Sequence, residues 1–426
     1  MTTTLFTAAL VVPVTAPPIM DGAVAVRDGR ILHVGDRRWV MATLAERGIA
    51  FAEHHWDGVL TPGLVNAHTH LQYTAMAAVG QGSYDGFPDW AAAFNPVYER
   101  GADWEASAAQ GAALLLASGT TAAADVVTDM AAASALHTAG LHGIAYWEVM
   151  DWTNDAWTLR GRAEVERALD ALPATPGTGL SPHAPYSLEI VPLLDIPDIV
   201  RERGSRIHIH LGEHAIEQEL EQTHPDPWHG AGVGSLRELR DAGYGTSATE
   251  YVDHLGVLGP DCHIAHGVYL GARDRAILRA RGSAVALCPR SNEVIGLGEP
   301  PVAAYLEEGS FIAVGTDSLA SSPSLDLMAD VAALFDIARR QGYHRADLAE
   351  RLLAAATLGG ARAMGLHLGR ERTGYLAVGA RADLAAFDLD VADATSTIEE
   401  LVRSGGGLAA QTVVGGTIRF TREDGA

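Results

Sequence analysis

His68 and His70 stand two positions apart, directly after an apolar run. Side chains two apart on an extended strand point to the same face, so both imidazoles can reach one metal ion. On its own this pair is weak evidence, because a pair that is merely hydrogen-bonded is commoner. The turn and apolar run at residues 60–65 strengthen it, since they predict that the pair ends a strand.

Three later apolar runs are followed by residues of the same kind. His208 and His210 share one face of a predicted strand, and His210 is the preferred ligand because it lies nearer the strand end. His266 and Asp317 end two further runs. A buried carboxylate is costly unless it meets a cation, which favours Asp317 as a ligand. The alternatives are a core histidine at His266 and an ion pair with an arginine at Asp317.

Glu213 lies three residues after His210, in a predicted loop. A carboxylate beside a metal-activated water, but not bound to the metal, is suited to carry protons. The alternative for Glu213 is a charge at a helix start. We therefore predict one divalent ion held by His68, His70, His210 and Asp317, with one coordination position left open. Glu213, His266 and Asp317 are the predicted catalytic residues.

Strands and helices alternate through the middle of the chain, which predicts a (β/α)8 barrel. In such a barrel the strands end at one mouth, so residues distant in sequence can meet there. The predicted strands are 63–67, 121–127, 143–149, 179–181, 206–211, 262–265, 283–287 and 311–315. The predicted helices are 104–118, 131–139, 161–172, 192–203, 235–242, 273–281 and 302–308.

Both ends of the chain are rich in short β-type runs. Residues 5–60 read as short strands, and Asp28-Gly29 between two alternating runs is a hairpin signal. Residues 374–389 and 413–421 have the same character. We expect residues 1–60 and 366–426 to form one small β-sandwich domain, and residues 61–365 to form the catalytic barrel.

Composition narrows the function. The net charge of −23 disfavours nucleic acid and anionic membranes as partners. All 30 basic residues are arginine, which removes mechanisms that need a lysine amine, including a carboxylated lysine bridging two metals. Two isolated cysteines fit a reducing compartment, and the N-terminal apolar run lacks a basic segment. A cytoplasmic enzyme is therefore expected.

Taken together, these motifs resemble the amidohydrolase superfamily, and in particular its mononuclear aminohydrolase branch. The matching segments are residues 61–70, His210 with Glu213, His266, residues 315–318 around Asp317, and the tail at 374–384. The resemblance covers essentially the whole chain. It implies a deaminase with one zinc ion, or an iron or manganese ion, and family members are often homodimers.

The resemblance also implies the reaction: water attacks an amino-bearing ring carbon, Glu213 moves the proton, and ammonia leaves. The segments 68–73, 82–90 and 146–150 look most like 6-aminodeoxyfutalosine deaminases, which act in menaquinone biosynthesis. Adenosine or S-adenosylhomocysteine deamination is the nearest alternative. Guanine deamination, triazine dechlorination, cyclic-amide hydrolysis and a catalytically silent metal protein are weaker ones.

Further residues near predicted strand ends are candidates for contact with an aminopurine-type substrate. His183 resembles the fourth-strand position where purine-nucleoside deaminases place a histidine against the substrate. The other candidates, for which loop packing is an equal alternative, are Gln72, Trp90, Glu148, Arg290 and Asn292.

Overall fold

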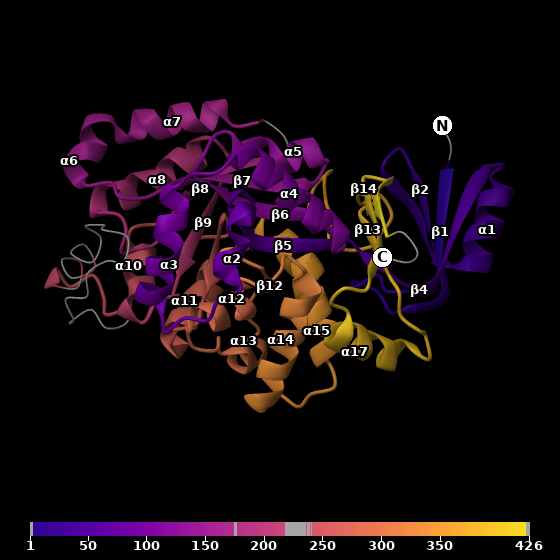
Figure 1. Ribbon diagram of the computed structural model, residues 1–426. Helices are drawn as coiled ribbons and strands as arrows, with labels where there is room; N and C mark the ends of the chain where they lie inside the picture. Colours follow the sequence, from indigo (N-terminus) through magenta and orange to yellow (C-terminus); the bar gives the residue numbers. More distant parts are fainter. Residues whose placement is uncertain (1–2, 174–176, 218–235, 237–238, 240, 423–426) are drawn as a thin grey trace.

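The computed structural model describes residues 3–173, 177–217, 236, 239 and 241–422. Its strands form two sheets, one of eight strands and one of seven (Figure 1). The eight-stranded sheet curls into a nearly closed barrel with helices around it, and the seven-stranded sheet lies to one side with both chain ends (Figure 1). The predicted α/β class is confirmed. Among the described residues no helix is long and apolar enough to span a membrane.

The barrel strands are parallel and follow one another in chain order. Their residues are almost all buried, as expected for strands covered on both faces. All eight strands predicted from the sequence are present: β5 (Leu64–Thr69), β6 (Thr120–Val127), β7 (His142–Val149), β8 (Gly177–Pro182), β9 (Arg206–Leu211), β10 (Cys262–His266), β11 (Ala284–Leu287) and β12 (Ile312–Val314).

The seam between the first and last barrel strands closes just beyond the end of β12. The backbone amides of Thr316 and Asp317 donate to the His68 carbonyl at 3.2 and 3.0 Å. Asn66 reinforces the junction, since its Nδ2 donates to Thr316 Oγ1 at 2.7 Å. The seam therefore closes through the segments that carry His68 and Asp317.

Helices cover the outside of the barrel. Those predicted at 104–118, 131–139, 161–172, 192–203, 273–281 and 302–308 are found within a few residues, and half of the one predicted at 235–242 lies outside the described residues. The helices here are α2 (Ala77–Gly80), α3 (Phe87–Glu99), α4 (Trp104–Ala117), α5 (Ala135–Ala139), α6 (Asn154–Ala156), α7 (Arg162–Ala171), α8 (Ile190–Glu202), α10 (Ala248–His254), α11 (Ala272–Arg281), α12 (Pro289–Ile295), α13 (Val302–Glu308), α14 (Leu327–Arg340), α15 (Leu348–Ala354) and α16 (Gly360–Ala363).

Two glycines let a helical turn lie across the seam. The π-helical turn η5 (Ala355–Gly359) runs into α16, and both contact β5 and β12, the two strands that meet there. A Cβ atom on Gly360 would lie 2.4 Å from the Val65 carbonyl oxygen, and one on Gly359 would lie 2.3 Å from that of Ile312. Any side chain at these positions would push the turn away from the barrel.

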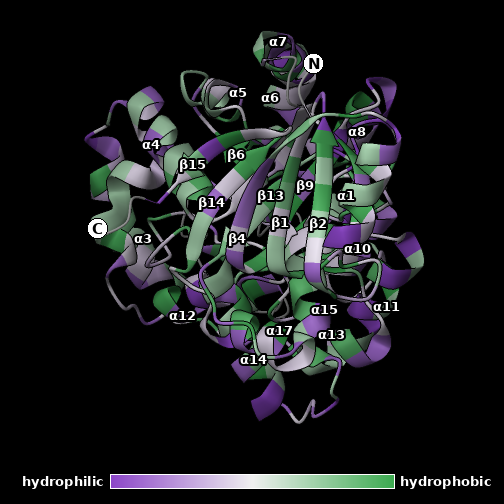
Figure 2. Ribbon diagram, turned by 90° about the vertical axis from the view of Figure 1, so that its right-hand side faces the viewer, coloured by the Kyte–Doolittle hydropathy of each residue, from purple (hydrophilic) through white to green (hydrophobic). Residues whose placement is uncertain are grey.

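The seven-stranded sheet joins the two chain ends, as the sequence predicts. Its order is β15-β14-β13-β4-β1-β2-β3, and Figure 2 shows β14, β13, β4, β1 and β2 side by side. These strands are β1 (Thr3–Val11), β2 (Ile19–Arg27), β3 (Arg30–Asp36), β4 (Phe51–Pro62), β13 (Leu384–Phe387), β14 (Ala409–Val414) and β15 (Thr417–Thr421). Helix α17 (Ala394–Ser404) lies between β13 and β14 in the chain.

The hairpin predicted at Asp28-Gly29 joins β2 to β3, and both turn residues have positive φ, 53° and 73°. The expectation of strands alone in 5–60 is wrong in one place. Helix α1 (Arg37–Glu46) interrupts them, because the Asp36 side chain caps its first turn and Val40 and Leu44 bury one face. In 374–389 only β13 is a strand.

Candidate active site

The side chains predicted to bind metal meet at the carboxyl ends of the barrel strands. His68 lies near the end of β5, His70 one residue beyond it, and His210 near the end of β9. His266 is the last residue of β10, and Asp317 follows β12. His266 and Asp317 both have a left-handed backbone, with φ of 74° and 58°. Such strain in residues with a side chain persists only where the surroundings impose it, and it is concentrated at functional sites.

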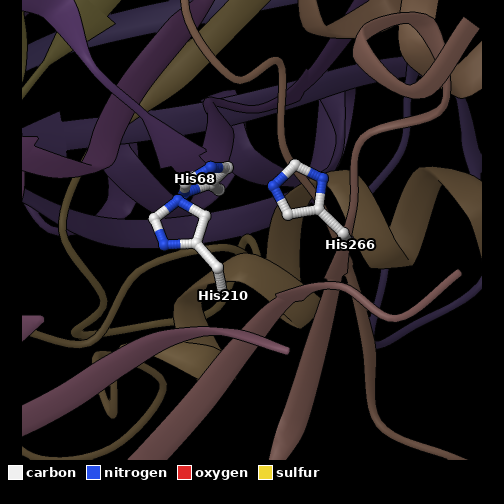
Figure 3. Close-up of side chains that lie close together, drawn as sticks. All are labelled: His68, His210 and His266. Atoms are coloured by element: carbon white, nitrogen blue, oxygen red, sulfur yellow. The ribbon is translucent and has the colours of Figure 1, made fainter. Parts of the chain in front are cut away.

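The ligand atoms of this cluster lie within a few ångströms of one another. Asp317 Oδ1 is 3.3 Å from His68 Nε2 and 3.6 Å from His70 Nε2. His70 Nε2 is 3.4 Å from His210 Nε2. Figure 3 shows the rings of His68, His210 and His266 turned toward one another. All of these side chains are buried. Atoms from four different strands thus surround one small volume.

Hydrogen bonds on the far side of the cluster fix two of the rings and the carboxylate. His210 Nδ1 donates to the His183 carbonyl at 2.8 Å, so its Nε2 presents a lone pair to the cluster. His266 Nδ1 donates to Asn292 Oδ1 at 3.2 Å, with the same consequence. Asp317 Oδ2 accepts from the Ser291 and Ser321 hydroxyls at 2.6 and 2.7 Å. Its Oδ1 remains directed at His68 and His70.

Burial sets the protonation states. It lowers the pKa of His70 to about 3 and lowers those of His68 and His210, so the imidazoles are neutral. Burial opposes ionisation of Asp317, but His68, 3.3 Å away, and the neighbouring imidazoles of His70 and His266 hold its pKa well below the usual range. Neutral imidazole and ionised carboxylate are the forms that bind metals.

The cluster fits a divalent ion. His68 Nε2 is buried and lies 3.3 Å from Asp317 Oδ1, but among the described residues it has no partner with hydrogen-bond geometry. His68, His70 and Asp317 offer ligand atoms within 4.8 Å of one another, and His68, His210 and His266 form an overlapping group. A cation would satisfy these lone pairs together, and nitrogen with carboxylate oxygen is a donor set that zinc accepts.

Glu213 and His266 form a second pair beside the cluster. Glu213 Oε1 lies 3.2 Å from His266 Nε2. Burial, with help from the charges of Asp317, Glu217 and Glu148, raises the pKa of Glu213 well above its usual value. A carboxyl group in this position can hold a proton near neutral pH and release it again.

A cavity of about 650 Å³ opens beside the cluster. His70, His210, Glu213 and Asp317 lie in its wall, as do three of the predicted substrate residues, namely Trp90, Glu148 and His183. Its volume is in the range of sites for small organic ligands.

The structure places the other three predicted substrate residues among packing contacts. Gln72 Oε1 accepts from the Thr128 backbone amide at 2.9 Å. Arg290 pairs with Asp330 at 3.4 Å, and Asn292 orients His266. None of the three lines the described part of the cavity.

Aromatic residues that were not among the predicted substrate residues form much of the cavity wall. They are Tyr73, Phe87, Phe94, Tyr98, Trp147 and Trp152. Phe94 and Tyr98 stand four apart on α3, and Trp147 precedes Glu148 at the end of β7. The four-residue spacing of Phe94 and Tyr98 predicts that they share one face of a helix. The sequence does not show that this face points toward the mouth of the barrel.

Residues 59–418 match the model of the amidohydrolase family. The chain belongs to the amidohydrolase family. It is similar to a 5-methylthioadenosine/S-adenosylhomocysteine deaminase of Nitratidesulfovibrio vulgaris (strain DP4), with 31% identity over 87% of this chain and 80% of the relative. A 5'-deoxyadenosine deaminase of Methanosarcina mazei is 28% identical over 94% of this chain and 88% of its own length. This amidohydrolase is a deaminase of the aminohydrolase class.

Solved structures share its fold. The zinc-bound adenosine deaminase of Xanthomonas campestris has a TM-score of 0.79 and 24% identity, covering 98% of this chain and 93% of the other. The aminofutalosine deaminase of Helicobacter pylori, in complex with methylthio-coformycin, has a TM-score of 0.79 and 20% identity, covering 97% and 99%. The two-sheet architecture of this amidohydrolase is therefore that of known enzymes.

Proposed function

We propose that this amidohydrolase removes the 6-amino group of an aminopurine nucleoside, using one divalent metal ion held by His68, His70, His210 and Asp317. The observation that carries the proposal is the meeting of those ligand atoms, at 3.3 to 3.6 Å, beside a cavity whose wall contains Glu213 and three of the four ligands, His70, His210 and Asp317. Zinc is the favoured ion, because relatives of this fold bind it and the donor set suits it.

The ion supplies Lewis acidity, which lowers the pKa of water to about 7. The residues of this chain do the rest. Glu213, neutral because it is buried, donates its proton to the ring nitrogen beside the amino-bearing carbon. His266 Nε2 accepts a hydrogen bond from the attacking water, because Asn292 holds the proton on Nδ1. The water oxygen bonds to the carbon, and the carbon–nitrogen bond then breaks. Glu213 takes up the two water protons in turn: it passes the first to the departing amine, which leaves as ammonia, and keeps the second, so that a lactam remains and Glu213 is neutral again.

The cavity also contains features for the rest of the nucleoside. His183 and Glu148 place ligand-type atoms within 4.8 Å of each other and of His210. Glu148 Oε1 is buried and, among the described residues, has no hydrogen-bond partner. Burial, with the charges of Asp317 and Asp151, raises the pKa of Glu148 to about 8. A protonated carboxyl can both donate to and accept from a substrate hydroxyl.

The charges of the wall favour an uncharged 5'-substituent. Asp151 lines the cavity, and Glu164 lines it at a partly exposed position. A carboxylate on the substrate would lie among these acids, whereas a methylthio group or a hydrogen would pack against the aromatic side chains. Both 5'-methylthioadenosine and 5'-deoxyadenosine fit this description.

A second candidate is 6-aminodeoxyfutalosine, the substrate that the sequence favours. The specific observation in its favour is the aromatic wall, since Trp147 and Trp152 could stack on an aryl substituent. Its carboxylate distinguishes it from the methylthio substrate.

The test is ammonia release from a panel of adenosine, 5'-methylthioadenosine, 5'-deoxyadenosine, S-adenosylhomocysteine, 6-aminodeoxyfutalosine, guanine and a triazine, with chloride measured in parallel. We expect release from the adenine nucleosides, its loss after chelation and its return with zinc. A zinc-loaded protein that released ammonia from none of the nucleosides would overturn the proposal.

A further inference from the structure

A second buried glutamate holds the loop that carries Glu213. Glu217 closes the short 3-10 turn η4 (Ala215–Glu217) and is 2% exposed. Its Oε2 accepts from the Gly212 amide at 2.7 Å, and its Oε1 accepts from the amides of Glu213 and His214 at 2.9 and 3.1 Å. One carboxylate thus collects three consecutive backbone N–H groups, and the middle one belongs to Glu213 itself.

The same loop is joined to the neighbouring loop that follows His266. The Gly267 amide donates to the Leu211 carbonyl at 3.1 Å, and the Tyr269 amide donates to the Gly212 carbonyl at 2.8 Å. Gly212 has a φ of +67°, and a Cβ there would lie 2.4 Å from Leu270. The loops bearing Glu213 and His266 are therefore in close contact, and both backbone paths meet at Gly212.

The His214 ring is fixed on the other side. It stacks on Phe87 with ring centroids 5.1 Å apart and planes 7° apart, and Phe87 lines the cavity. Gly212 and His214, on either side of Glu213, are thus both held by backbone hydrogen bonds, and His214 is also held by the packing of its ring. The position of the Glu213 carboxyl, 3.2 Å from His266 Nε2, depends on this short stretch of chain.

We propose that Glu217 is a positioning residue for the deamination, holding the backbone of residues 212–214 so that Glu213 reaches both the ring nitrogen and the departing amine. The proposal rests on the proposed function, because it gives Glu213 the role of proton carrier. Glu217 itself does not line the described cavity and touches no reacting atom.

Two substitutions separate this role from a general contribution to folding. Glu217→Gln keeps the length of the side chain, but in either orientation its NH2 group opposes at least one backbone N–H. Glu217→Ala removes all three hydrogen bonds. Because a misplacement of about 1 Å can cost roughly 100-fold in rate, we expect kcat to fall about 10-fold or more in Glu217→Gln and about 100-fold in Glu217→Ala. KM for the best nucleoside and the zinc content should stay near wild-type values.

Glu250→Gln is the matched control. Glu250 is also a buried glutamate whose carboxylate accepts from a nearby loop amide, that of Thr246, and from the Thr246 hydroxyl at 3.1 Å. It lies on α10 and does not line the described cavity. Glu250→Gln should therefore lower the melting temperature of the protein without lowering kcat.

A binding measurement gives a second readout. Methylthio-coformycin mimics the tetrahedral transition state, so its Kd should rise with the fall in kcat/KM across the Glu217 variants, while the Kd of the product inosine nucleoside stays unchanged. If folded, zinc-loaded Glu217 variants kept wild-type kcat, or lost no more than Glu250→Gln, the inference would be wrong. A wild-type protein that neither released ammonia nor bound methylthio-coformycin would instead overturn the proposed function, and the inference with it.

Discussion

Replacing Glu213 with glutamine tests the proton transfer most directly. The side chain is 5% exposed, and glutamine has nearly the same shape, so the fold and the metal ligands should be retained. What the variant loses is the exchangeable proton. Glutamine can still donate a hydrogen bond to the ring nitrogen, but it can neither give up a proton nor accept one from water.

The neighbours of Glu213 set the size of the loss. General acid–base catalysis contributes about 10²- to 10⁴-fold in rate, or about 2.7 to 5.4 kcal/mol. The titratable side chains nearest to Glu213 cannot replace it as a proton donor, because burial lowers the pKa of His266 to about 4 and Asp317 is ionised. Neither holds a proton for the ring nitrogen at neutral pH. We therefore expect the upper half of the range, a fall in kcat of about 10³-fold or more.

The assay is ammonia release under saturating nucleoside, with zinc content measured on the same sample. A Glu213→Gln protein with a full complement of zinc and a kcat within tenfold of wild type would refute the assignment. A loss of zinc would instead show that Glu213 contributes to holding the ion.

Three further predictions concern the pH response, the seam and the substrate. Burial raises the pKa of Asp125 from 3.8 to about 8. Between these pH values the folded protein keeps the Asp125 proton, whereas the unfolded chain releases it. The free energy of unfolding therefore falls by up to about 1.4 kcal/mol per pH unit as the pH rises from about 4 to about 8. Asp125→Asn keeps an oxygen that accepts from the Leu71 amide, and it should make the free energy of unfolding, measured by urea titration from pH 5 to 8, depend less on pH. The same pH dependence in the variant and the wild type would contradict the prediction. Gly360→Ala should lower the free energy of unfolding by about 1 to 3 kcal/mol, whereas Gly406→Ala, whose Cβ would make only ordinary contacts, should not. The kcat/KM for 5'-methylthioadenosine should exceed that for S-adenosylhomocysteine by about tenfold or more, and Asp151→Asn should reduce this ratio; equal kcat/KM values in the wild type would contradict the prediction.

The barrel was predictable because its strands are buried on both faces. Such strands appear as apolar runs, and metal-binding residue types at their ends stand out against them. Helix α1 was less visible, since only Val40 and Leu44 of its ten residues are buried and its start depends on the cap at Asp36. The division into domains at residues 60 and 366 stays a prediction.

The substrate residues were only partly predictable, because beyond the end of a strand the sequence does not show where a side chain points. Gln72 follows His70 by two residues, but the turn η1 (Leu71–Met76) begins between them and directs its side chain to Thr128. Arg290 was a candidate for binding a substrate carboxylate, but it forms an ion pair with Asp330, which is forty positions away in the chain. His183 and Glu148 lie directly at strand ends, and both line the cavity.

The position of the seam would give a bound metal ion a role in unfolding. Segments 250 positions apart supply both the hydrogen bonds that complete the ring and two of the proposed ligands, His68 and Asp317. Bringing such distant segments together is entropically costly, and an ion that binds only the closed ring adds its binding free energy to that closure. Release of a bound ion would then weaken the contact between the first and eighth strands, and parting of these strands would in turn weaken binding of the ion.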